Sequence, residues 1–165
     1  MKKMKLFSLL IICAGFNSCA ILKPPIIVKN EFIGNYKYIY VASTNSLTSS
    51  SGSSYGGQYY SSSKSVNPSD VIIGILTKEG FIALPEIKPE LIDQTLIVNY
   101  GESGKRNIAG GLGGYTIEVT IQFISAKTHT LMSSCTAEGQ GETEADDIRK
   151  AINRCLAGLL DRWTK

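Results

Sequence analysis

The chain has 165 residues, of which 43% are hydrophobic and 19% are charged, and its formal net charge is +3 at pH 7. Three of its 17 basic residues, Lys2, Lys3 and Lys5, lie at the extreme N-terminus, and the rest of the chain carries 14 basic and 14 acidic residues. Beyond these three lysines the chain is therefore neutral, is long enough for one hydrophobic core, and lacks the basic surface that nucleic-acid binding requires.

The first 18 residues have the three parts of a secretory signal: charged lysines, an apolar stretch from Leu6 to Phe16, and small or polar residues after it. The apolar stretch is about half as long as the ~20 residues that a membrane-spanning helix requires. We therefore expect residues 1–18 to be an export signal that is removed.

The signal ends in Phe16-Asn17-Ser18-Cys19, which resembles the lipobox of bacterial lipoproteins, although Phe16 and Asn17 depart from its commonest form. The resemblance implies that Cys19 is lipidated and becomes the first residue of a chain anchored to a lipid bilayer. Ala20, rather than Asp, follows the cysteine. By resemblance to lipoprotein sorting, this favours the outer membrane, with the domain facing the periplasm. An ordinary signal peptide is the alternative.

We expect residues 19–33 to form a tether that Pro24-Pro25 stiffens, followed by a single domain over residues 34–165. Residues 35–43 predict a strand because they are rich in Tyr, Ile and Val. Eleven of the next 24 residues (43–66) are serines, and this composition predicts a flexible loop. Its tyrosines, Tyr55, Tyr59 and Tyr60, are candidate contacts for a ligand or partner.

A helix is predicted after Asn67, because Asn67 is a suitable N-cap and Pro68 and Asp70 are favoured in a first helical turn. Gly80 is expected to end it. Residues 81–84 predict a short buried strand, and Pro85 and Pro89 bracket a turn.

The second half predicts three strands, at residues 95–103, 115–123 and 131–141. Apolar and polar residues alternate strictly over 115–123, which is typical of an antiparallel strand with one solvated face. Because the connections are short, the three strands are expected to form a meander.

The last predicted element is a helix that begins after Thr143, where Asp146 completes a capping pair. One apolar stripe follows it, with residues Ile148, Ile152, Cys155, Leu156, Leu159, Leu160 and Trp163. The element order β-α-β-β-β-β-α predicts an α+β fold with an antiparallel-rich sheet of four to five strands and two helices packed on one face.

Motifs for catalysis are weak. Ser54 lies in a Gly-x-Ser-x-Gly match, but this match falls in Ser/Gly-rich sequence, and the only histidine of the chain, His129, is in a predicted turn. Lys105 and Arg106, in a glycine-rich hairpin, are candidate ligand or partner contacts. No cluster of His and Cys predicts a metal site, and no motif predicts a cofactor.

Two cysteines remain after Cys19, namely Cys135 on a predicted strand and Cys155 on a predicted helix. Export permits a disulfide between them. Two separately buried thiols are the alternative.

The stretch from Tyr115 to Leu160, with "YTIEVTIQFISAKTHTLMSSCTAEGQG" and "EADDIRKAINRCLAGLL", resembles a group of periplasmic lipoprotein domains. The group includes the curli-secretion lipoprotein family, the N-terminal domain of the Tol–Pal β-propeller protein, and lipoproteins of unknown function. The resemblance implies a non-enzymatic scaffold or protein-interaction domain with an envelope protein partner. A small-ligand or glycan-binding lipoprotein is the second hypothesis, and a serine hydrolase the third.

Overall fold

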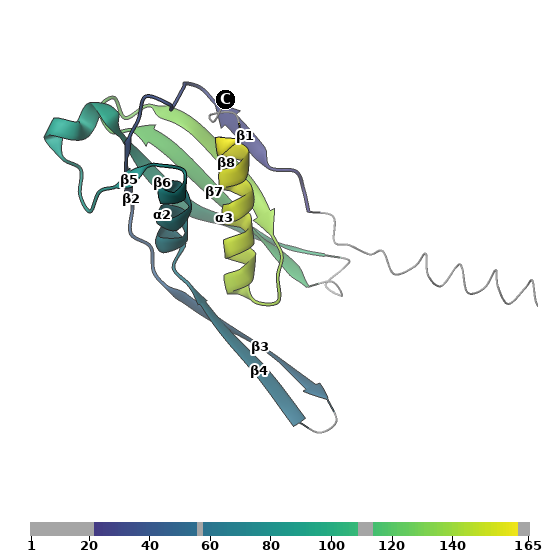
Figure 1. Cartoon of the computed structure of the whole chain (residues 1–165). Coiled ribbons are helices and arrows are strands. Elements are labelled where there is room, and N and C mark those ends of the chain that lie inside the picture. Colours follow the sequence, from purple (N-terminus) through teal and green to yellow (C-terminus); the bar gives the residue numbers. More distant parts are fainter. Residues whose placement is uncertain (1–21, 56–57, 109–113, 162–165) are drawn as a thin grey trace, which may run out of the picture.

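A computed structural model describes residues 22–55, 58–108 and 114–161 (Figure 1). Its main feature is a mixed sheet with the strand order β1-β8-β7-β6-β2-β5. The strands are β1 (Ile26–Lys29), β2 (Tyr38–Val41), β5 (Ile82–Ala83), β6 (Thr95–Asn107), β7 (Tyr115–Ser125) and β8 (Leu131–Gly139). Two helices, α2 (Pro68–Lys78) and α3 (Glu144–Leu160), lie side by side on one face of this sheet, and a 3-10 helix, η1 (Pro89–Gln94), precedes β6 (Figure 1).

The predicted α+β class and the two helices are confirmed, and so is the β6–β7–β8 meander, whose strands pair antiparallel. The predicted strand count is wrong, because the sheet has six strands and a separate two-stranded hairpin adds two more. The sheet is also mixed, since β2 pairs in parallel with both β5 and β6.

The first extra strand, β1, lies where the sequence predicted a tether. Residues 26–29 pair antiparallel with β8, so that Ile26 is opposite Thr136 and Lys29 is opposite Ser133. The Lys29 ammonium also donates a hydrogen bond of 2.8 Å to the Leu159 carbonyl at the end of α3. The sheet therefore begins at Ile26, and the residues that link it to Cys19 are fewer than expected.

The second difference is in the serine-rich segment. Residues 47–55 (β3, Leu47–Tyr55) and 58–66 (β4, Gln58–Val66) form an antiparallel hairpin rather than a flexible loop. Figure 1 shows this ribbon projecting beyond the body of the domain. Its base is held by α3, because Lys64 forms an ion pair of 2.8 Å with Asp146 and the Ala145 amide donates to the Ser49 hydroxyl.

The core lies between the sheet and the two helices. The alternation of β7 places Ile117, Val119, Ile121 and Phe123 on the helix side, where at most 1% of each residue is exposed. The predicted stripe of α3 meets them from Ile148 to Leu160, while Trp163 lies outside the described residues.

Glycine permits the close approach of α3 to β8. A Cβ atom added to Gly139 would lie 1.9 Å from the Asp147 carbonyl oxygen, which is shorter than any van der Waals contact. Gly139, the last residue of β8, therefore sets how closely the helix packs on the strand.

The two helices begin differently. Thr143 caps α3 as predicted, since its hydroxyl accepts from the Asp146 amide. Asn67 does not cap α2 with its own side chain. Instead the Ser69 amide donates to the Thr44 hydroxyl at 2.9 Å, and Thr44 donates in turn to the Asn67 side-chain oxygen at 2.6 Å. No helix of the described ranges is long and apolar enough to cross a membrane.

Candidate functional site

Three features of the described residues are candidates for function: a pocket at one end of the sheet, an ion-pair cluster at the other end, and the exposed edge of β1. The sequence identified none of the three as a site, although Arg106 of the ion-pair cluster was named as a candidate contact residue.

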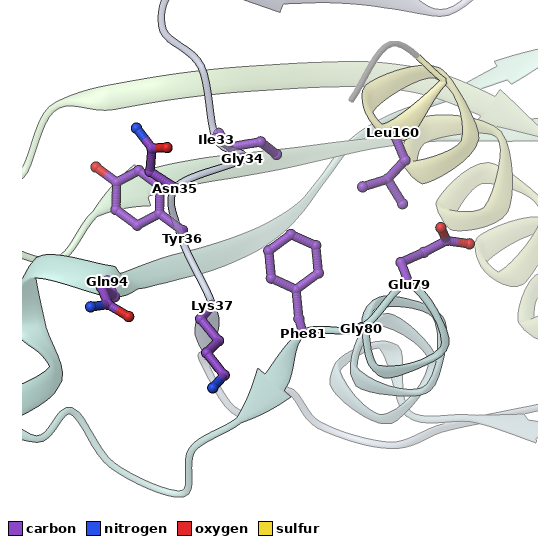
Figure 2. A pocket seen from close by; sticks show the side chains of 10 residues that line it. All are labelled: Ile33, Gly34, Asn35, Tyr36, Lys37, Glu79, Gly80, Phe81, Gln94 and Leu160. Atoms are coloured by element: carbon purple, nitrogen blue, oxygen red, sulfur yellow. The ribbon is translucent and has the colours of Figure 1, made fainter. Parts of the chain in front are cut away.

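The pocket has a volume of about 470 Å³ and opens where the C-terminal ends of both helices meet the start of β2 (Figure 2). Figure 2 shows the Phe81 ring pointing into the space between the segment that leads into β2 and the last turn of α3. The pocket is lined by Ile33, Gly34, Asn35, Tyr36, Lys37, Glu79, Gly80, Phe81, Gln94 and Leu160.

The lining of the pocket is suited to binding more than to acid–base chemistry. It combines apolar and aromatic surface with two side-chain amides, and among its lining residues Glu79 is the only carboxylate. The Tyr36 hydroxyl is directed to the Met132 sulfur, 3.8 Å away, and the Lys37 ammonium lies 5.8 Å from the centre of the Tyr38 ring. An apolar pocket with a few polar groups is typical of small-molecule sites.

At the opposite end of the sheet, Glu138 is the centre of a cluster that we call the Lys23 clamp (Lys23, Arg106, Glu138 and Arg154). The Arg106 guanidinium donates to both carboxylate oxygens of Glu138, at 2.8 and 2.6 Å. The backbone amide of Lys23 donates to the same carboxylate at 3.1 Å. Arg154 donates to the carbonyl oxygens of Glu138 and Lys23, the latter at 2.9 Å.

The clamp keeps a buried carboxylate charged. Only 3% of Glu138 is exposed, and the bidentate Arg106 contact lowers its pKa to about 2 against the opposing effect of burial. Paired donors of this geometry are among the stronger interactions of a protein surface. The N-terminal segment is thus fixed to the sheet from Lys23 onwards.

The third feature is β1, which is the first strand at one edge of the sheet. Its first three side chains are apolar but exposed: 65% of Ile26, 38% of Ile27 and 45% of Val28 are accessible, and nearby 57% of Phe32 is accessible. An apolar strand at a sheet edge is a site where another extended chain can add by main-chain hydrogen bonding.

The residues singled out from the sequence do not converge on one site. Ser54 lies inside β3, paired with Tyr59, and not on a strand-to-helix turn. His129 lies in the β7–β8 turn, beside the start of β6, whereas the β3–β4 hairpin is attached to the N-terminus of α3 at the other end of the sheet. A serine–histidine pair therefore does not form between them.

The three tyrosines lie near the tip of the hairpin, where Tyr60 pairs with Ser53, Tyr59 with Ser54, and Tyr55 with Gln58. The structure does not describe the side chains of these tyrosines, and Cys19 lies outside the described residues. Lys105 forms an ion pair of 2.7 Å with Glu144 at the start of α3, and Arg106 belongs to the clamp.

Cys135 and Cys155 are both buried, and both are free thiols in this structure. They face each other between β8 and α3, and the hydrogen bond that Cys155 makes with Cys135, together with burial, raises the pKa of the Cys155 thiol. Among the described residues, no group of three or more His, Cys, Asp or Glu side chains is arranged to hold a metal ion.

No family model and no curated protein matches the chain. Among solved structures, two dodecamers of PelC from Paraburkholderia phytofirmans, one of them a point variant, each superpose with a TM-score of 0.44 at 12% identity. Each match covers 82% of this chain and 94% of the PelC chain.

Proposed function

We propose that this protein is a non-enzymatic envelope lipoprotein, anchored through Cys19, whose periplasmic domain binds an envelope protein partner. The observation that carries the proposal is the exposed apolar edge of β1, where Ile26 and Val28 are 65% and 45% accessible. Exposed apolar side chains on an edge strand favour strand addition, in which main-chain hydrogen bonds supply affinity and side-chain contacts supply specificity.

The position of β1 supports this reading. The strand begins seven residues after Cys19, so a partner added at this edge would be held beside the anchored end of the chain. The separation of Ser54 from His129 supports a binding role over the hydrolase hypothesis, because a nucleophile and its base must be within hydrogen-bonding reach.

The test is photo-crosslinking in intact cell envelopes, with a photoreactive residue at Asn30, which is exposed and directly follows β1. We expect a discrete crosslinked adduct, and we expect an Ile26→Asp/Val28→Asp double variant to lose it, because carboxylates disfavour an apolar interface. The matched control carries the same probe at Glu90, an exposed position on η1.

An adduct of equal yield at Asn30 and Glu90, or one that the double variant leaves unchanged, would contradict strand addition at β1. A Cys19→Ala variant separates anchoring from binding. We expect it to leave the membrane fraction, and its adduct to weaken because the local concentration of the partner falls.

A second candidate function is small-ligand binding, which the 470 Å³ pocket beside Phe81 favours. Its location differs from that of Tyr55, Tyr59 and Tyr60, the tyrosines that the sequence suggested as candidate ligand contacts, because none of them is among the described residues that line this pocket. A glycan or small-molecule panel, read out by thermal shift, tests it: a hit whose shift disappears in Phe81→Ala supports the pocket, whereas a shift retained in that variant contradicts it.

A further inference from the structure

The Lys23 clamp limits how far the domain can move from the bilayer. Cys19 and Lys23 are four residues apart, and a chain extends by at most ~3.6 Å per residue. Whatever path residues 20–22 take, Lys23 therefore lies within about 14 Å of the lipidated residue. This bound replaces the expected spacer of residues 19–33, which would permit a much longer reach.

Lys23 is also fixed to the folded domain through both of its backbone polar groups. Its amide donates to the Glu138 carboxylate at 3.1 Å, and its carbonyl accepts from Arg154 at 2.9 Å. The Lys23 ammonium adds a weaker ion pair with Glu138 at 3.6 Å. These contacts join the N-terminal segment to β8 and to α3, so that only the residues between Cys19 and Lys23 separate the anchor from the folded domain.

We infer that the clamp end of the domain is a bilayer-facing surface, and that the end with the Phe81 pocket faces away from the membrane. This inference rests on the proposed lipidation of Cys19, but the geometry that orients the domain is independent of that chemistry. The occupant of the surface is the lipid bilayer itself, because Lys23 lies within about 14 Å of the residue that carries the lipid.

The strands set the separation of the two ends. Glu138 pairs with Glu118 on β7. Lys127 lies nine positions after Glu118, just past the end of that strand. At ~3.3 Å per strand residue, the two levels are roughly 30 Å apart. The β3–β4 hairpin projects from the clamp end, because its base is bound to the N-terminus of α3 (Figure 1).

The experiment is energy transfer from the domain to acceptor dyes on lipid headgroups, in proteoliposomes that contain the full mature protein. A ketone-bearing residue at Asn107, next to Arg106, or at Lys127 carries the donor dye and leaves the thiols untouched. Both positions are exposed. We expect transfer from Asn107 to be at least about threefold more efficient than from Lys127, since transfer falls steeply over the roughly 30 Å between the two levels.

Two variants keep the inference falsifiable. The quantity compared is the ratio of the transfer efficiency from Asn107 to that from Lys127. Twenty Gly/Ser residues inserted between Ala20 and Ile21 leave the domain intact and should bring this ratio close to one, because such a linker has a root-mean-square length of about 25 Å. Arg154→Gln removes the bond to the Lys23 carbonyl and should lower the ratio, with folding checked by circular dichroism. A ratio near one in the unmodified chain would overturn the orientation, and an unchanged ratio in Arg154→Gln would overturn the part assigned to the clamp.

Failure of the anchor and failure of the orientation are distinguishable. The mass of the N-terminal peptide is measured by mass spectrometry in the same samples, and an unmodified Cys19 contradicts the proposed lipid anchor. In that event Cys19 is coupled to a maleimide headgroup lipid and the energy transfer is measured again. A transfer efficiency that is higher from Asn107 than from Lys127 then supports the orientation with the clamp end towards the bilayer, and a ratio of the two near one overturns it.

Discussion

Arg106 on β6 and Glu138 on β8 form a bidentate ion pair across the intervening strand β7, with donor–acceptor distances of 2.8 and 2.6 Å. The same carboxylate accepts from the Lys23 amide. The buried Glu138 side chain thus links the N-terminal segment to the sheet formed by β6, β7 and β8. Its protonation state therefore affects the stability of the fold.

The first prediction concerns pH. The folded-state pKa of Glu138, about 2, lies below its value in an unfolded chain, so the carboxylate stabilises the fold above about pH 4.5 and this contribution is lost as the pH falls towards 2. We expect the free energy of unfolding to fall by about 1–2 kcal/mol between pH 6 and pH 3, which is less than the whole difference in pKa would give, because pH 3 still lies above the folded-state pKa and because Arg106 is partly exposed to solvent. Urea unfolding at pH 6 and pH 3 measures it.

Glu138→Gln is the matched control, because it keeps the shape of the side chain and cannot titrate. Its free energy of unfolding should be lower than that of the unmodified chain at pH 6, and the difference should narrow at pH 3. Parallel pH profiles for the two proteins would rule out Glu138 as the titrating group.

The second prediction concerns the contact between β8 and α3. Gly139→Ala places a methyl group against the backbone of Asp147 and Ala151, which cannot move without shifting the helix. We expect a loss of roughly 2–4 kcal/mol in the free energy of unfolding. Gly101→Ala on β6 is the control, since a Cβ there meets nothing within 4 Å. Equal stability of the two variants would refute the close-packing role of Gly139.

The third prediction concerns the start of α2. The cap is supplied by Thr44, a residue 25 positions before Ser69, so Thr44→Val should cost about 1 kcal/mol although it lies outside the helix. Thr44→Ser keeps the hydroxyl and should retain most of the stability. A Thr44→Ser variant as unstable as Thr44→Val would show that the methyl group, rather than the hydrogen bond, matters.

The sequence predicted the elements whose pattern is local. β7 was found because its buried residues, Ile117 to Phe123, recur at every second position, and α3 because its stripe has helical spacing and a Thr143 cap. β1 was missed because Ile26–Lys29 is only four residues long and its apolar side chains are exposed, so that its place depends on the partner strand β8.

The hairpin was missed for a related reason. Serine favours neither strand nor helix, and the β3–β4 ribbon is held at its base by tertiary contacts such as Lys64 with Asp146. The pocket also has no local signal, because Lys37, Phe81, Gln94 and Leu160 come from four separate parts of the chain. Arg106 was named as a candidate ligand or partner contact, but its partner within the domain, Glu138, is 32 positions later and becomes evident only when β6 and β8 flank β7.

The fourth prediction concerns the hairpin itself. Lys64→Ala removes the ion pair that joins the ribbon to Asp146 on α3, and also the longer contact, at 3.4 Å, with Glu142 just before the helix. Because the tertiary contacts at its base keep the ribbon in place, we expect limited proteolysis within residues 47–66 to be faster in the variant, with little change in the unfolding of the core. Lys127→Ala, which removes an exposed ion pair with Asp93 elsewhere, is the control. Equal cleavage rates in the two variants would contradict the anchoring role of Lys64.

The last prediction concerns Cys135 and Cys155. Their thiols face each other across the β8–α3 contact, so we expect that thiol–disulfide exchange with an oxidised protein dithiol, as available to exported proteins, joins them and releases a reduced dithiol. The bond would close a loop of about 20 residues and add roughly 3 kcal/mol, which corresponds to a melting temperature ~6–12 °C higher. Thiol counting in denatured protein isolated from envelopes, before and after reduction, measures the bond directly. Two reactive thiols in the unreduced sample, in addition to any at Cys19, would show that the pair stays reduced, and the melting temperature should then be insensitive to a reductant.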